Sequence, residues 1–239
     1  MDNMYSGKIS HFGVNIKNSP KLQINRDTYA TIDKRNHCNN EVYMLKTYQK
    51  EVLQKYYEDD ECTIYTDDWC EQHRKKCLQN FDLNMIYMNS LSTEEFEKEL
   101  NTFIKKAKKL KQIFDLNDCD YMEGIYVMVL DKYKQVYIGQ STNIKKRIMT
   151  HWSKTKQFDR LLFGSVEKSV LSIDSFGALD TTRIFVYPTY DIYKEEEKLV
   201  KAMNSKYMLN RTGGGIGLDN ETYKLEILAN VKYRNFEKS

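Results

Sequence analysis

The clearest pattern of hydrophobic and polar positions lies in residues 92–114. Apolar side chains recur there at intervals of three and four residues, as one face of an α-helix requires. They are Phe96, Leu100, Phe103, Ile104, Ala107, Leu110, Ile113 and Phe114. Ser92 followed by Glu95 is a capping-box pattern. We therefore predict an amphipathic helix over residues 92–114. Its lysine-rich face is better explained as a solvated surface than as a contact with nucleic acid.

After residue 118 the pattern changes to short runs rich in β-branched and aromatic residues. Such runs at 124–130, 135–139 and 182–187 predict three strands, the last ending at Pro188. Helical patterns follow at 144–152 and 192–203. Asp191 caps the second, and Ser141, Thr142 or Asn143 caps the first. The order hairpin, helix, strand, helix predicts an α/β unit with a central, mostly antiparallel three-stranded sheet flanked by helices.

The first 90 residues have only weak periodicity, with candidate helices at 46–57 and 67–79. We therefore divide the chain into three parts. Residues 1–118 form a mostly helical region of unknown role, residues 119–217 form the α/β domain, and residues 218–239 form a C-terminal extension that we expect to be helical.

Composition narrows the class of protein. The chain has 239 residues, of which 41% are hydrophobic, so it can bury a core and is not disordered as a whole. No apolar stretch reaches the length of a membrane span, and the N-terminus lacks the apolar segment of a secretory signal. Five cysteines without an export signal indicate free thiols in a reducing, cytoplasmic compartment.

The formal charge of +3 says little, but its distribution is uneven. Residues 51–71 hold eight acidic side chains and one lysine, whereas residues 140–160 hold six basic side chains and one acid. A basic stretch in a near-neutral protein fits a local site for a polyanion. Two solvated faces of opposite sign are the more common explanation of such runs.

Two tyrosines lie on the predicted hairpin. A turn at Asp131-Lys132 would set Tyr126 opposite Tyr137 on one face of the sheet, and a longer turn would shift this register by one or two residues. Two phenols would then project from one patch. Ordinary cross-strand packing is the competing explanation, because the chain has 18 tyrosines.

The helix after the hairpin carries two further candidates. Ile144, Ile148 and Trp152 form its buried seam, and Arg147 and His151 flank that seam one turn apart. A guanidinium there can bind a phosphate with two hydrogen bonds, and an imidazole can transfer a proton. A surface arginine and a half-buried histidine remain the plainer interpretation.

The last helix places Glu196 within its apolar stripe. A carboxylate in that position needs a metal ion or a basic side chain as a partner. Beyond the helix come Asn210 and the glycine-rich run 211–217. The glycines permit close approach of the backbone to a ligand such as phosphate, and a mobile loop explains them equally well.

Together these residues resemble the GIY-YIG nuclease family. The motif that names the family stands as Gly124-Ile125-Tyr126 and Tyr137-Ile138-Gly139, with the second tyrosine eleven positions after the first. The other matching positions, in chain order, are Arg147, His151, Glu196 and Asn210. The histidine matches only some branches of the family. The resemblance covers about residues 123–215.

The resemblance implies a DNA endonuclease that depends on a single Mg²⁺ or Mn²⁺ ion held by Glu196. Arg147 would stabilise the phosphate. Either tyrosine could be the general base; we expect Tyr126 to take this role through His151, with Tyr137 orienting the reacting groups. Asn210 would position the backbone or Glu196. We expect a restriction or defence enzyme. A repair or homing-like nuclease, or a non-cleaving nucleic-acid-binding module, remains open. The expected partner is DNA, recognised in part by residues 1–118. No membrane partner is expected, and the oligomeric state is not indicated.

Two features stand outside the resemblance. Residues 165–182 are longer than the domain needs, and we expect Asp174, Asp180 and nearby Arg183 to form buried ion pairs rather than contact substrate. In the N-terminal region, the cysteines and histidine that could share one helix face match no strong zinc pattern, so we expect buried free thiols and no zinc site. These residues are Cys62, Cys70, His73 and Cys77.

Overall fold

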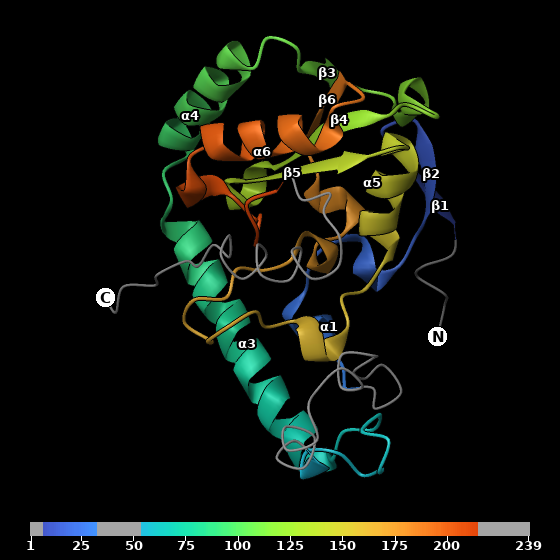
Figure 1. Cartoon of the computed structure of the whole chain (residues 1–239), viewed down its shortest axis with the longest axis vertical. Helices are drawn as coiled ribbons and strands as arrows, with labels where there is room; N and C mark the ends of the chain where they lie inside the picture. The colour runs from blue at the N-terminus through green and yellow to red at the C-terminus, as the bar shows by residue number, and fades with distance from the viewer. Residues whose placement is uncertain (1–6, 33–53, 215–239) are drawn as a thin grey trace.

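The computed structural model describes residues 7–32 and 54–214 of the chain. Its centre is a four-stranded antiparallel sheet with the strand order β3-β6-β4-β5 (Figure 1). The strands are β3 (Lys111–Ile113), β4 (Gly124–Leu130), β5 (Gln135–Ser141) and β6 (Arg183–Pro188). The predicted mixed α/β class is confirmed, and each of the three predicted strands is present. The prediction of three strands was one too few, because β3 adds a fourth at the edge.

The strand β3 replaces the end of the predicted helix over 92–114. The helix α4 (Thr93–Lys106) begins as predicted, with the Ser92 hydroxyl accepting a hydrogen bond from the Glu95 amide. It ends at Lys106, and residues 111–113 pair with β6 instead. Leu110 and Ile113 are three residues apart, as residues on one face of a helix are. In an extended segment at the sheet edge, the same two residues can instead pack on opposite faces of the sheet. Pairing with β6 therefore prevails over the local helical pattern.

The hairpin of β4 and β5 has a register two residues away from the predicted one. Tyr126 pairs with Gly139, and Tyr137 pairs with Met128. The turn is longer than predicted, because a 3₁₀ turn at Asp131–Tyr133 is followed by Lys134 in the left-handed conformation. A shift of two residues preserves the side of the sheet on which each residue lies. Both phenols therefore still project from one face.

The two faces of the sheet bury different clusters. Alternate residues of β4, among them Tyr126 and Met128, pack with α5 (Ile144–Ser153) and with α3 (Asp67–Ser90). The intervening residues, such as Val127, pack with α4 and with α6 (Ile192–Ala202). β4 is buried along its whole length, as a central strand covered on both faces should be.

Part of the N-terminal region is not helical. A short hairpin of β1 (Lys8–His11) and β2 (Val14–Lys17) lies beside α5 (Figure 1). It is followed by a 3₁₀ turn, η1 (Pro20–Leu22), and by the short helix α1 (Arg26–Tyr29). The predicted helix at 67–79 is present as the longer α3. The predicted helix at 46–57 falls mostly outside the described residues, and the extension 218–239 falls wholly outside them.

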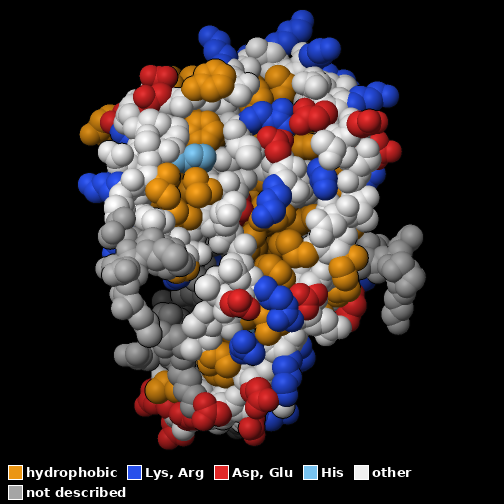
Figure 2. Space-filling view, turned by 180° about the vertical axis from the view of Figure 1, so that it is seen from behind, with side chains coloured by type: hydrophobic (Ala, Val, Ile, Leu, Met, Phe, Trp, Pro, Cys, Tyr) orange, Lys and Arg blue, Asp and Glu red, His pale blue; other side chains and the backbone are white. Residues whose placement is uncertain are grey.

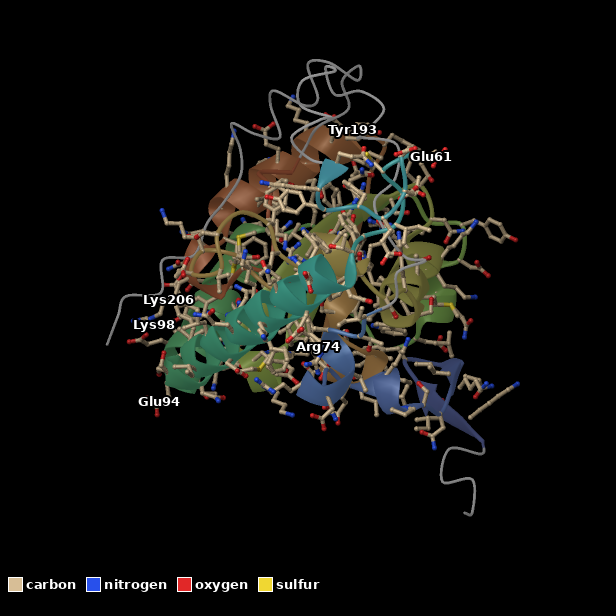
Figure 3. All side chains as sticks on the ribbon, turned by 90° about the horizontal axis from the view of Figure 1, so that it is seen from below. Glu61, Arg74, Glu94, Lys98, Tyr193 and Lys206 are labelled. Atoms are coloured by element: carbon tan, nitrogen blue, oxygen red, sulfur yellow. The ribbon has the colours of Figure 1, made fainter. Side chains whose placement is uncertain are left out.

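The core does not separate at the boundary predicted near residue 118. One buried cluster contains Val14, Tyr29 and Phe81 from before it and Tyr126 and Ile148 from after it. The end of the domain is also tied to α4, because the Lys206 ammonium pairs with the Glu95 carboxylate at 2.9 Å. Figure 3 shows Lys98 of α4 and Lys206 beside each other.

The acidic stretch noted in the sequence gathers at one end of the molecule. Its exposed side chains lie where α3 begins, at the lower end of Figure 2. They are Glu58, Asp60, Glu61, Asp67, Asp68 and Glu71. Within the described residues, no helix is long and apolar enough to cross a membrane.

Candidate active site

Tyr126 lies at the centre of the candidate site, and Gly139 makes room for it. Tyr126 is completely buried on β4, directly across from Gly139 on β5. A Cβ atom at position 139 would come within 2.4 Å of the Tyr126 hydroxyl. Glycine is therefore required here by the close approach of the phenol, which accounts physically for the glycine after Tyr137-Ile138.

The Tyr126 hydroxyl begins a chain of two short hydrogen bonds. Its oxygen lies 2.8 Å from Nε2 of His151, and Nδ1 of His151 lies 2.6 Å from Oδ1 of Asp174. Because a carboxylate can only accept a hydrogen bond, Nδ1 carries the proton and donates a hydrogen bond to Asp174. Nε2 of a neutral imidazole is then an acceptor, and the phenol donates to it. The three side chains come from β4, from α5 and from the short turn Ile173–Ser175.

The pKa values of the three groups agree with these roles. Burial raises the pKa of Tyr126 well above its usual value, so its phenol is neutral. Burial also lowers the pKa of His151, more strongly than Asp174 raises it. Burial acts to raise the pKa of Asp174, but the hydrogen bond from His151 and nearby positive charges outweigh it and lower the pKa. At neutral pH the phenol therefore donates a hydrogen bond to the imidazole, and the imidazole donates one to the carboxylate.

Tyr137 lies against the same groups but is only partly buried. Its ring centroid is 6.2 Å from that of Tyr126 and 5.3 Å from that of His151, nearly perpendicular to the imidazole. Burial raises its pKa to about 12, the charge of Glu196 adds to this, and Arg147 opposes it. The prediction that both phenols share one patch is confirmed, although they are diagonal neighbours rather than directly opposed.

Arg147 comes from the first turns of α5, which is capped by the Asn143 side chain accepting a hydrogen bond from the Lys146 amide at 2.9 Å. Its side chain is exposed, yet its charge acts to lower the pKa of Tyr126 and of Tyr137. The guanidinium is thus close to both phenols and accessible to an anion from solvent.

Glu196 reaches the site from α6, which packs on the opposite face of the sheet next to β5. The carboxylate is partly exposed, and its charge acts to raise the pKa of Tyr126 and of Tyr137. The side chain lies against Gly214, the last described residue of the glycine-rich run. Among the described residues, no three metal-binding side chains gather at one point. Glu196 can therefore offer one carboxylate to a cation, with water and substrate as the remaining ligands.

Asn210 contacts the backbone rather than the phenols. Its side-chain amide accepts a hydrogen bond from the Ile138 amide at 3.0 Å and donates one to the Ile138 carbonyl at 2.7 Å. The neighbouring Leu209 amide donates to the Val136 carbonyl. Asn210 thus extends the pairing of the β5 edge and holds the strand that carries Tyr137.

The insertion 165–182 contains a functional partner that the sequence did not indicate as one. Asp174 is predicted to form a buried ion pair, and it instead accepts a hydrogen bond from the neutral imidazole of His151. Arg183 does form ion pairs, with Glu97 at 2.6 Å and with Asp131. Asp180, by contrast, is bound by backbone amides and by a phenol rather than by a basic side chain. Its donors are the amides of Ile24 and Gly177 and the hydroxyl of Tyr133.

The thiols of the N-terminal region are buried, as predicted. Cys62, Cys70 and Cys77 are buried and form no disulfide within the described residues, and burial raises the pKa of Cys77 to about 12. His73 is occupied otherwise, because its Nε2 lies 2.8 Å from the carbonyl oxygen of Phe158 and its ring stacks on another aromatic side chain.

The candidate site is therefore one cluster built from β4, β5, α5, α6 and the insertion. Comparison of the chain with family models, with curated proteins and with solved structures finds no significant match.

Proposed function

We propose that this chain is a nuclease of the GIY-YIG type that hydrolyses phosphodiester bonds of DNA with the help of a divalent cation. The observation that carries the proposal is the hydrogen-bonded chain Tyr126–His151–Asp174, with the Arg147 guanidinium and the Glu196 carboxylate next to it. The mixed α/β fold, whose antiparallel sheet contains β6, β4 and β5, is compatible with the proposal.

Hydrolysis of a phosphodiester needs a deprotonated water molecule, and Tyr126 is the group we assign to this step. A phenol is a poor base unless its own proton has an acceptor. Nε2 of His151 is such an acceptor at 2.8 Å, so Tyr126 can pass its proton to His151 while taking one from water. Asp174 then stabilises the imidazolium that forms, as the carboxylate does in a catalytic triad.

The developing negative charge on the phosphate needs a positive partner. Arg147 is the basic side chain that borders both phenols, and it is exposed. Its planar guanidinium can donate two parallel hydrogen bonds to phosphate oxygens. Tyr137 orients the reacting groups from the partly open side of the cluster, and Asn210 holds its strand in place.

Glu196 fits the role of metal ligand. One partly exposed carboxylate leaves room for the water and phosphate oxygens that Mg²⁺ prefers as its other ligands, and Mn²⁺ can take the same set. When bound, such an ion supplies positive charge for the phosphate and for the leaving oxygen.

The biological role is a separate question from the chemistry of the site. We propose a restriction or defence nuclease, with a repair or homing-like enzyme as the alternative. Incubation with duplex and branched DNAs in Mg²⁺, followed by sequencing of the ends, separates these roles. Discrete cut positions indicate a restriction-type enzyme, and cuts that depend on DNA structure indicate repair.

Plasmid nicking with Mg²⁺ or with EDTA tests the proposed chemistry. We expect wild-type protein to cleave only with the metal, and Glu196→Ala to abolish cleavage while circular dichroism shows an unchanged fold. Glu197→Ala is the matched control, because Glu197 lies on the same helix and forms a surface ion pair with Lys201. Full activity of Glu196→Ala refutes the metal assignment. DNA binding without any cleavage favours a non-cleaving module on the same fold.

A further inference from the structure

A groove lies on the far side of α5 from the candidate active site. It runs between α5 and the N-terminal segment formed by β2 and η1, and its volume is about 800 Å³. Figure 1 shows β1 and β2 lying along α5, and the lining of the groove includes residues from Asn143 to Ser153 at that helix. None of the proposed catalytic residues lines it.

The polar rim of the groove is basic. Lys17, Lys21, Lys145 and Lys146 line it, and among the described residues Asp120 is the one acidic side chain in the lining. Asp120 pairs with Lys145 at 3.1 Å, which leaves three positive charges without a carboxylate among the lining side chains. This excess favours a polyanion as the occupant.

The hairpin adds to this charge at a cost in stability. Lys8 and Lys17 are both exposed and lie directly opposite each other in the register of β1 and β2. Like charges at opposed positions destabilise a strand pair. An anion bound beside Lys17 would reduce the repulsion.

The floor of the groove is apolar and carries an exposed aromatic ring. Ile16, Met149 and Trp152 contribute to the floor, and Tyr121 stands at its edge with 86% of its surface exposed. The backbone of Tyr121 is left-handed, with φ of 57°, which is strained for a bulky side chain. The following residue, Met122, accepts a hydrogen bond from the Ile144 amide at 2.9 Å, which fixes this turn at the start of α5.

Lysines on the rim, apolar side chains on the floor and an aromatic ring at the edge suit a single strand of nucleic acid better than a duplex. A duplex presents phosphates to the rim but keeps its bases stacked inside, away from the floor. A single strand can place its phosphates on lysines and its bases on aromatic and apolar side chains at the same time. The combination found here is the one that single-stranded nucleic acid requires.

The groove is also placed to receive DNA that leaves the candidate site. Lys146 and Arg147 are neighbours on α5, and successive helical residues lie about 100° apart around the axis. The exposed surface of α5 at Lys146 and Thr150 therefore connects the phosphate-binding side of the helix with the groove. A strand that passes over one helix would reach from one to the other.

We propose that this groove binds a single-stranded segment of DNA next to the cleaved bond, with its phosphates on the rim lysines and a base stacked on Tyr121. The proposal rests on the proposed nuclease function for the identity of the DNA, and it specifies the substrate further. The preferred substrate is then a duplex with a single-stranded tail or branch rather than a fully paired duplex.

Fluorescence anisotropy of the full chain in EDTA, which prevents cleavage, tests the groove separately from catalysis. The probes are one duplex with a blunt end and the same duplex with a twelve-nucleotide single-stranded tail. We expect Tyr121→Ala to weaken binding of the tailed duplex by about 5- to 100-fold, the usual range for one stacked base, and to leave the blunt duplex unchanged. Tyr121→Phe should restore binding, and Phe114→Ala is a control at another exposed aromatic position.

The lysines are tested through salt dependence. We expect Lys17→Ala with Lys21→Ala to reduce the slope of log affinity against log salt by about 1.4 for the tailed duplex, since each single-strand phosphate contact contributes about 0.7. Lys98→Ala with Lys105→Ala removes two exposed lysines of α4 as a control. Equal affinity for tailed and blunt duplexes, or no effect of Tyr121→Ala, overturns the proposal.

The two proposals can fail independently. Cleavage of DNA in Mg²⁺ with no preference for the tail would refute the groove and keep the nuclease. Binding of the tail through Tyr121 without cleavage by the wild-type protein would support the groove as a single-strand site and count against the nuclease.

Discussion

At the scale of single residues, the role of His151 depends on the group behind it. Asp174 holds the imidazole by a hydrogen bond of 2.6 Å to Nδ1, which leaves Nε2 to accept from Tyr126. An amide at position 174 could instead donate to Nδ1 and reverse the tautomer, so that Nε2 would no longer accept the phenol proton. Asp174 is thus a positioning residue that acts on Tyr126 through His151.

We expect Asp174→Asn to lower the cleavage rate by about 10²-fold or more, in line with the loss of the orienting carboxylate in other triads. The charge and hydrogen bond of Asp174 raise the pKa of His151, while Arg147 and Lys154 lower it. Without Asp174 the pKa of His151 falls further, so the acidic limb of the pH–rate profile should move to lower pH. Asp82→Asn, at an exposed ion pair, is the control. An unchanged profile would show that His151 does not depend on Asp174.

At the scale of elements, the fit of Tyr126 over Gly139 joins β4 to β5 and to the site. We expect Gly139→Ala to destabilise the protein by about 1–3 kcal/mol, the usual cost of overpacking a core, since a Cβ would lie 2.4 Å from the Tyr126 hydroxyl. Urea denaturation of a double-mutant cycle measures the coupling. In a Tyr126→Ala background the added methyl has space, so Gly139→Ala should cost much less there. Equal costs in both backgrounds would contradict the contact.

The local patterns around the site were enough to predict its strands and helices. Residues 124–130 and 144–152 were assigned correctly because each pattern agrees with the burial that the fold imposes. The sequence leaves the hairpin register open by one or two residues, because a two-residue turn and the observed turn around Lys134 place the same residues on the core face. The predicted helix over 92–114 extends too far, because the residues that pair with β3 lie 71 to 75 positions later in the chain.

At the scale of the whole molecule, contacts between distant segments were beyond the reach of the sequence. The predicted site residues Tyr126, Tyr137, Arg147 and Glu196 come together, whereas the Asn210 side chain hydrogen-bonds the backbone of β5. Asp174 joins His151 from an insertion with no spacing signal. The hairpin β1–β2, which forms one wall of the groove, belongs to a region with no readable period. Such contacts depend on tertiary packing, which no local pattern encodes.

Packing of that kind also sets how stability depends on pH. Burial lowers the pKa of three histidines. One ring nitrogen of each forms a hydrogen bond with a group that is distant in the sequence. His11 is bonded to the carbonyl of Thr181, His73 to that of Phe158, and His151 to Asp174. The folded state therefore resists protonation of all three. The unfolded chain binds these protons near the ordinary histidine pKa of about 6.5.

The sign of the effect follows from this difference. The unfolded state binds more protons below about pH 6.5, so these histidines favour unfolding as the pH falls through that value toward their lowered pKa. Asp159 and Asp180 act in the opposite sense, because burial raises the pKa of both. We expect the three histidines to prevail and the Tm to fall between pH 7.5 and pH 6.0 at constant ionic strength. His11→Gln, which keeps a donor for Thr181, should flatten this dependence. A Tm that stays level in wild type, or that falls equally in the variant, would show that burial of His11 does not couple protonation to folding.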